Sequence, residues 1–111
     1  MTFQKAADLS QIADGTALAI ELDGNDVALV RVGDDVFAVE DMCSHAMVPL
    51  SEGDVEGCEI ECWLHGSRFD VRTGEALNLP ATEPVPTYAT QIDGDVVLVD
   101  LDTPNTFQSD T

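Results

Sequence analysis

Two short segments each pair a cysteine with a histidine. The first reads Cys43-x-His45 and the second Cys62-x₂-His65, with sixteen residues between them. Either spacing lets a single loop direct a thiol and an imidazole toward one metal centre. Both histidines of the 111-residue chain fall in these matching pairs, which favours ligation over packing. We therefore expect Cys43, His45, Cys62 and His65 to be metal ligands.

Two metal centres fit this set of donors. Two thiolates and two imidazoles can hold one tetrahedral zinc ion in a structural site. Alternatively, the two cysteines can hold one iron of a [2Fe-2S] cluster while the two histidines hold the other. The spacing of the ligands is compatible with both centres, so their surroundings must distinguish them.

The segments that position these ligands are typical of an all-β protein. Turn-forming pairs such as Asp14-Gly15 and Asp93-Gly94 separate short runs rich in Val, Ile, Leu and Thr. From Asp26 to Glu40, apolar and charged residues alternate, as on a sheet with one buried face. A helical turn near 8–12 would have Asp8 as its cap. The predicted strands are 16–22, 26–32, 36–40, 55–61, 68–71, 87–92 and 95–101.

Three loops interrupt these strands. Segments 41–54 and 62–66 contain the four candidate ligands. The third, Leu79–Pro86, holds three prolines, which fix φ and withhold amide donors. We predict one domain, 1–111, in which an antiparallel β sandwich or barrel carries an inserted two-loop subdomain for the metal. Its parts would be a scaffold at about 1–40 and 77–102, the inserted subdomain at about 41–76, and a frayed polar tail at 103–111.

The composition narrows the choice of partners. The chain has 22 acidic residues against 4 Lys and Arg, so its formal net charge is -18. This balance argues against nucleic acid and anionic membranes as partners, because both require clustered basic residues. No apolar run is long enough to span a bilayer, and the N-terminus does not resemble a signal peptide. Without a spanning segment or a signal peptide, we expect a soluble, cytoplasmic protein. Since 44% of the residues are hydrophobic, we also expect a packed core.

The three cysteines do not suggest a disulfide framework. An odd number in a chain without an export signal favours metal binding or buried thiols. Cys58 shares one face of the predicted strand 55–61 with Ile60. We therefore interpret Cys58 as a buried thiol that packs like a small apolar residue, not as a further ligand.

The pattern C-x-H, sixteen residues, then C-x₂-H-G-S-x-F-D, from Cys43 to Asp70, resembles the Rieske iron–sulfur family. The chain is most similar to the small Rieske-type ferredoxins that serve multicomponent non-haem iron oxygenases. The resemblance covers nearly the whole chain, with Leu79–Pro86 as the matching third loop. One departure is Trp63, where members of the family usually carry proline; this change removes no ligand.

The resemblance implies one [2Fe-2S] cluster per chain. Cys43 and Cys62 would bind the inner iron, and His45 and His65 the outer, solvent-facing iron. Imidazoles are neutral, so exchanging two thiolates for them makes the cluster easier to reduce, at about −150 to +300 mV.

The resemblance also implies a position within that range. Rieske proteins of high potential add a disulfide between the loops, at positions that correspond to Val48 and Leu64 here, and hydroxyl donors to the cluster sulfurs. Ser67 matches one donor position, whereas Phe69 replaces the tyrosine that often supplies the other. Since fewer donors stabilise the reduced cluster less, we expect a potential of about −150 to −50 mV.

Several residues near the ligands are interpreted as structural. Met42 and Met47 would form a hydrophobic cover over the cluster. For Trp63, packing within the second loop is favoured over a role in docking a partner. Arg68 and Arg72 would form ion pairs instead of steering a partner. The acids expected as their partners are Asp54, Asp70 and Glu75.

By resemblance the protein is a one-electron carrier and not an enzyme. It would accept electrons from a flavin-containing NAD(P)H reductase and pass them to a terminal non-haem iron oxygenase. The catalytic subunit of such an oxygenase needs two further histidines for a mononuclear iron, and the chain has none left. Two alternatives stay open: an electron donor linked to iron–sulfur cluster assembly, and a zinc-binding structural or interaction module.

If the protein is an electron carrier, its acidity can serve in docking to partner proteins. Oppositely charged patches on partner proteins would speed the brief encounters that electron transfer requires. This explanation predicts that the rate of electron transfer falls steeply with salt, and a flat salt profile would reject it. A halophilic source would produce the same composition, so that alternative stays open.

Overall fold

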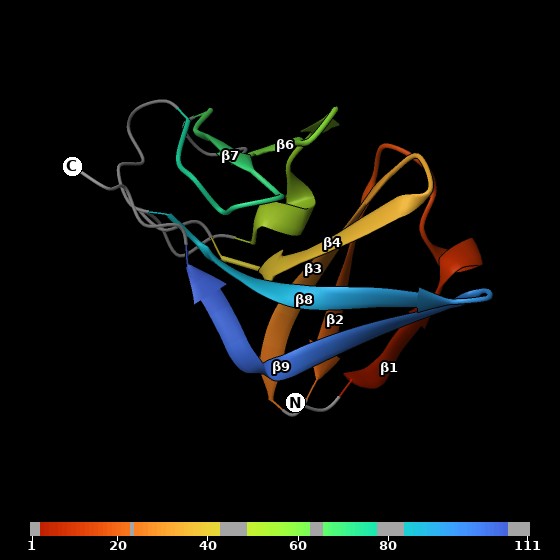
Figure 1. The fold of residues 1–111 in the computed structure, drawn as a ribbon. Helices are drawn as coiled ribbons and strands as arrows, with labels where there is room; N and C mark the ends of the chain where they lie inside the picture. Colours follow the sequence, from red (N-terminus) through yellow and green to blue (C-terminus); the bar gives the residue numbers. More distant parts are fainter. Residues whose placement is uncertain (1–2, 23, 43–48, 63–65, 78–83, 107–111) are drawn as a thin grey trace.

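The chain folds into two antiparallel β-sheets. A computed structural model describes residues 3–22, 24–42, 49–62, 66–77 and 84–106. The larger sheet consists of β1 (Phe3–Asp8), β2 (Ala17–Leu22), β3 (Asn25–Val32), β4 (Asp35–Glu40), β8 (Pro86–Asp93) and β9 (Val96–Thr106). The smaller sheet consists of β5 (Val55–Glu56), β6 (Glu59–Glu61) and β7 (Arg68–Asp70). Their orders are β1-β9-β8-β4-β3-β2 and β5-β6-β7 (Figure 1).

Helical structure in these residues is limited to two single turns. They are η1 (Leu9–Gln11) and η2 (Leu50–Glu52). The η1 turn lies where a helical turn was predicted, and the Asp8 N–H donates to Gln11 Oε1 at 2.8 Å. Within the described part of the chain, no helix is long and apolar enough to cross a membrane.

Strand β3 is buried on both of its faces. Its four central residues, Val27–Val30, have no exposed surface, and successive side chains of a strand point to opposite faces. Val27 and Leu29 pack into a first core inside the larger sheet, whereas Ala28 and Val30 pack into a second core on its outer side. The prediction of one buried face for this region is therefore wrong, because the smaller sheet covers the other face.

The second core joins the smaller sheet to the larger one. It brings together residues of β3, β4, η2, the small sheet and the chain leading into β8. Figure 1 shows β6 and β7 stacked beside β3 and β4. The buried members of the second core are Ala28, Val30, Val39, Leu50, Ile60, Cys62, Phe69, Val71 and Val85.

The predicted all-β class is confirmed, and most predicted strands agree with the structure to within one or two residues. The smaller sheet lies between β4 and β8 in sequence, inside the predicted insertion at about 41–76, whose boundaries stay a prediction. Strand β1 was not predicted; it pairs with β9 in the larger sheet. The tail was predicted to fray from residue 103, but β9 continues to Thr106; 107–111 lie outside the described residues.

The single strand predicted at 55–61 is wrong. The segment forms a hairpin, β5–β6, in which Val55 pairs with Ile60 and Glu56 with Glu59. Gly57 sits in the turn with φ +59°, a left-handed conformation that glycine adopts without steric cost. One glycine without a second turn-forming neighbour was too weak a signal to predict this reversal.

A backbone hydrogen bond joins the turn after β7 to the residue that precedes β8. The Val85 N–H donates to the Gly74 carbonyl at 2.9 Å. Gly74 has φ +83°, and a Cβ added there would lie 2.0 Å from the Val85 carbonyl oxygen. This position therefore requires glycine for two reasons, conformation and close approach.

We expect Gly74→Ala to destabilise the protein by about 3 kcal/mol or more, since it adds an overlap with backbone to the strain of a left-handed alanine. Gly57→Ala is the matched control, because Gly57 also has a positive φ but has open space around its Cβ position. Its expected cost is about 1 kcal/mol. Urea unfolding measures both; equal losses would contradict the proposed close contact.

Candidate metal centre

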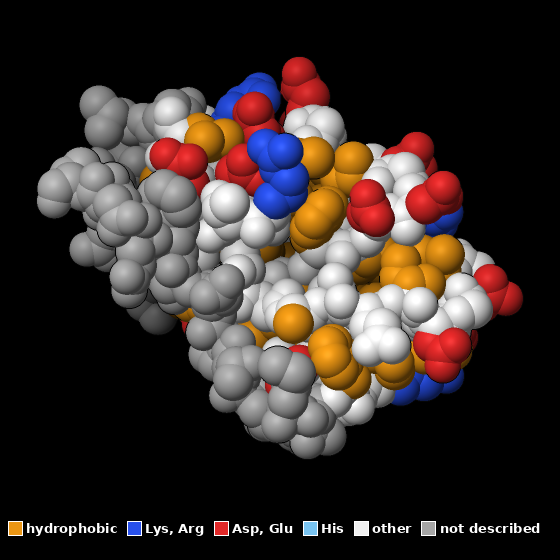
Figure 2. All heavy atoms as spheres, in the orientation of Figure 1, with side chains coloured by type: hydrophobic (Ala, Val, Ile, Leu, Met, Phe, Trp, Pro, Cys, Tyr) orange, Lys and Arg blue, Asp and Glu red, His pale blue; other side chains and the backbone are white. Residues whose placement is uncertain are grey.

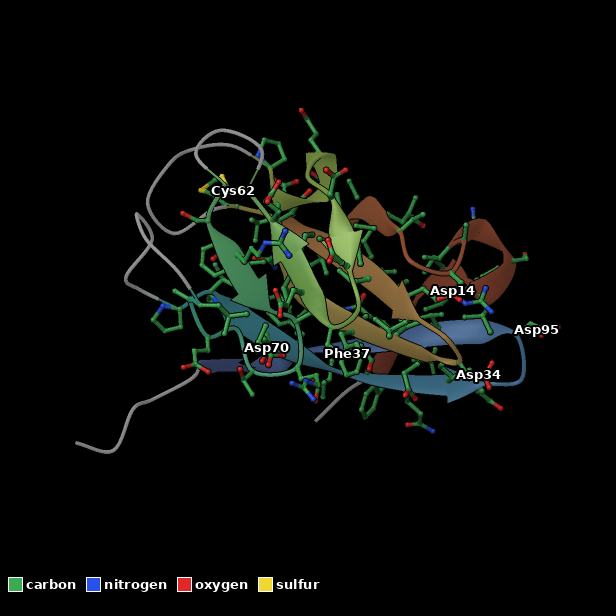
Figure 3. All side chains as sticks on the ribbon, turned by 90° about the horizontal axis from the view of Figure 1, so that it is seen from above. Asp14, Asp34, Phe37, Cys62, Asp70 and Asp95 are labelled. Carbon is green, nitrogen blue, oxygen red and sulfur yellow. The ribbon has the colours of Figure 1, made fainter. Side chains whose placement is uncertain are left out.

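Cys62 is the one predicted ligand that lies among the described residues. Cys43, His45 and His65 lie outside them. Cys62 follows β6 directly and has 0% of its surface exposed. It belongs to the second core and forms no disulfide with another described cysteine. Figure 3 shows Cys62 at one end of the molecule, far from Asp14 and Asp34 at the other.

Backbone hydrogen bonds close the segment that starts at Cys62. The Cys62 N–H donates to the Ser67 carbonyl at 2.6 Å, and the Gly66 N–H donates to the Cys62 carbonyl at 2.9 Å. Gly66 has φ +76°, which suits a tight reversal of the chain. These bonds join both ends of 63–65, the part of the sequence that carries His65.

The surroundings of Cys62 suit a soft thiolate ligand shielded from water. Ile60 and Phe69 of the small sheet and Leu50 of η2 are fully buried in the same core. Soft thiolates select metals such as zinc and the iron of iron–sulfur clusters. The residues present therefore fit a cluster ligand at Cys62. The adjacent Ser67 is fully buried too.

Asp41, which follows β4 and begins the first ligand-bearing segment, is anchored by contacts that were not predicted. Asp41, which is 8% exposed, accepts two hydrogen bonds from Ser51. The Ser51 N–H donates to Oδ1 and its hydroxyl to Oδ2, each at 2.7 Å. An aspartate after a strand and a serine ten residues later give no recognisable motif, so only the structure identifies this pair.

Arg68 lies on the small sheet among three glutamates. Its guanidinium is 3.4 Å from Glu59, 3.5 Å from Glu61 and 3.7 Å from Glu56. The hydrogen bond to Glu59 and the charge of Glu56 raise the pKa of Arg68. These three acids differ from the expected Asp54, Asp70 and Glu75, because the β5–β6 hairpin places Glu56, Glu59 and Glu61 beside Arg68. Figure 2 shows basic side chains surrounded by acidic ones over this sheet.

Arg72 pairs with Asp70, as predicted. Its Nη2 lies 2.8 Å from Oδ2 and its Nε 3.0 Å from Oδ1, while the Arg72 backbone N–H donates to Oδ1 at 2.9 Å. These bonds favour the charged carboxylate, so the hydrogen bond from the Arg72 side chain lowers the pKa of Asp70 against the opposing effect of burial. The pair holds the turn that follows β7.

The remaining interpretations near the site have mixed outcomes. Cys58 packs against the second core as predicted, but it is only partly buried, and its exclusion from the ligands stays a prediction. Met42 is 39% exposed and Phe69 fully buried. Because Phe69 has no hydroxyl, it can donate no hydrogen bond to a cluster sulfur. The low reduction potential expected for this reason stays a prediction. Met47 and Trp63 lie outside the described residues.

We expect Asp70→Asn to lower the free energy of unfolding by about 1 kcal/mol at neutral pH. The folded pKa of Asp70 is lowered, so its contribution is fully present above the unfolded value of about 3.9 and is lost as the pH falls through the folded value. The difference between wild type and variant should therefore shrink in acid. Urea unfolding from pH 7 to pH 3 measures it, with Asp34→Asn as an exposed control; a constant difference would contradict the assignment.

The fold and the buried cysteine define a class: a small all-β protein with a candidate metal-binding loop at one end. Residues 2–89 match the Rieske [2Fe-2S] domain. The chain is 41% identical over 96 residues to the ferredoxin component of the naphthalene 1,2-dioxygenase system of Pseudomonas aeruginosa, with 86% of this chain and 92% of the relative covered. The chain therefore belongs to the Rieske [2Fe-2S] domain family.

Solved structures agree with this assignment. The ferredoxin of carbazole 1,9a-dioxygenase from Nocardioides aromaticivorans superposes with a TM-score of 0.85 at 42% identity, covering 89% of this chain and 97% of that one. A chain in the complex of reduced oxygenase and oxidized ferredoxin of carbazole 1,9a-dioxygenase gives 0.82 at 31% identity, with 97% of both chains covered.

These comparisons confirm the predicted family, the Rieske-like fold and the [2Fe-2S] cofactor. They favour the iron–sulfur interpretation of the two Cys–His pairs over the zinc interpretation. They also confirm that the relatives are electron-transfer components and not catalytic enzymes themselves. The assignment of individual ligands stays a prediction.

Proposed function

We propose that this protein is a one-electron carrier that takes electrons from a flavin NAD(P)H reductase and delivers them to a terminal non-haem iron oxygenase. The observation that carries the proposal is the 41% identity to a dioxygenase ferredoxin component over nearly the full length of both chains. The fold supports it, since the carbazole dioxygenase ferredoxin superposes along almost its whole length. The proposal retains the soluble, cytoplasmic location expected from the sequence.

We propose Cys43 and Cys62 as ligands of the inner iron and His45 and His65 as ligands of the outer iron. The bound cluster supplies a reversible one-electron couple, and the chain supplies ligands, shielding and position. Burial of Cys62 in the second core keeps water away from one thiolate. The backbone bonds between Cys62, Gly66 and Ser67 then fix where its segment begins and ends.

His45→Ser and His65→Ser should each abolish the visible absorption and the electron paramagnetic resonance signal of the Rieske cluster, because the outer iron loses an imidazole. Cys58→Ser is the matched control, since it alters a thiol of the same region that is not proposed as a ligand. Spectra and iron content of the three purified variants provide the measurement. A Rieske spectrum in either histidine variant would refute the assignment.

The oxygenase partner is proposed by similarity to the carbazole 1,9a-dioxygenase system, whose ferredoxin has been solved in complex with its oxygenase. The charge of -18 supports transient docking to a cationic partner surface. Attraction between exposed charges weakens with salt, since the Debye length falls from about 10 Å at 0.1 M to about 3 Å at 1 M.

Electron transfer from the reduced protein to a terminal oxygenase of the same organism should therefore slow at least about tenfold between 0.05 and 0.5 M salt. Stopped-flow absorbance of the cluster measures the rate, and the His65→Ser protein serves as the inactive control. A rate that does not depend on salt would contradict electrostatic docking. An oxygenase that stays oxidised at every salt concentration would contradict the proposed function itself.

A further inference from the structure

The two ligand-bearing segments are connected through a short path of described contacts. The path starts at Asp41, two residues before Cys43 in the sequence. Its carboxylate accepts both the backbone N–H and the hydroxyl of Ser51. Asp41 is itself fixed to the larger sheet, because its N–H donates to the Asp26 carbonyl at 3.0 Å. The clasp, defined here as the pair Asp41 and Ser51, therefore closes the chain around 42–50.

The clasp also satisfies the start of η2. The residue before this turn is Pro49, which makes no side-chain cap hydrogen bond. Amide groups at the start of a helical turn lack partners within the turn and need one from elsewhere. Asp41 supplies that partner across ten residues of sequence, and both carboxylate bonds are partly buried, so their loss is costly.

From η2 the path continues to Cys62. Gly53 follows η2 so closely against β6 that a Cβ there would lie 1.6 Å from the Glu61 carbonyl oxygen. The Glu61 N–H donates to the Asp54 carbonyl at 2.8 Å. Glu61 immediately precedes Cys62. The contacts thus run from Asp41, near the first ligand pair, to Glu61, beside the second.

We propose that the clasp is a positioning device that sets the separation of the two ligand-bearing segments. This inference rests on the proposed ligands Cys43 and Cys62. A cluster shared by two segments needs both segments at a fixed separation before it binds. The clasp maintains that separation whether or not the cluster is bound. Its loss should therefore speed the loss of the cluster more than it lowers the free energy of unfolding.

Three variants test the clasp. Asp41→Ala removes both bonds, and Ser51→Ala removes only the one made by the hydroxyl. Asp41→Asn conserves the shape, because its Oδ1 can accept from the Ser51 N–H while its Nδ2 donates to the Ser51 hydroxyl oxygen. Asp14→Ala is the matched control, since Asp14 Oδ1 also accepts a backbone N–H across a loop, from Gly33 at 2.7 Å, but at the end of the molecule opposite Cys62 (Figure 3).

The experiment measures the rate of cluster loss to an iron chelator, by visible circular dichroism, together with urea unfolding. We expect Asp41→Ala to lose the cluster about tenfold faster than wild type. Ser51→Ala should be intermediate, and Asp41→Asn and Asp14→Ala close to wild type. The circular dichroism of Asp41→Ala should also change before loss, because the segments shift around the irons.

Two results would overturn the clasp: equal loss rates for Asp41→Ala and Asp14→Ala, or failure of Asp41→Asn to rescue. If Asp41→Ala does not fold, the rates of Ser51→Ala and Asp41→Asn decide in the same way. A wild-type protein without a Rieske spectrum would instead reject the proposed ligands, so the two failures are distinguishable.

Discussion

The structure depends on the burial of β3 and β4 between two cores. One face of β3 packs into the first core, inside the larger sheet. Its other face provides the apolar surface on which the small sheet packs. Hydrophobic burial is roughly proportional to the apolar area removed from water, so the outer face is what makes a three-stranded sheet of such short strands stable. Cys62 lies in this second core. The candidate metal centre is therefore built on the packing that joins the two sheets.

The few basic residues are already used within the fold. Arg31 donates to the carbonyls of Leu9 and Ile12, and Lys5 lies 3.4 Å from Asp8. Arg68 and Arg72 both lie on or beside the small sheet and pair with its acids. With 22 acidic residues against 4 basic ones, most carboxylates have no cation in the chain to neutralise them. The protein thus presents a negative field, and field strength at the surface governs rates of encounter more than affinity.

Candidate ligands could be proposed from the sequence, because the chemistry of a cluster demands particular residue types at a fixed spacing. Strands bordered by strong turn signals, such as β3 with Gly24 before it and Gly33 after it, could also be predicted. Other features depended on contacts remote in sequence. The second buried face of β3 requires the small sheet, β1 requires β9, and the partners of Arg68 require the hairpin at Gly57. None of these pairings leaves a local pattern.

The same contrast separates the candidate ligands from the residues proposed to position them. A ligand position tolerates few residue types, so it leaves a motif that a single sequence reveals. A proposed positioning contact such as that between Asp41 and Ser51 needs only one acceptor, two donors and the correct separation in space. Many sequences can satisfy that requirement, and the separation arises from β4, η2 and β6 together. In this proposal the fold sets the precision of the centre, and the four candidate ligands set its chemistry.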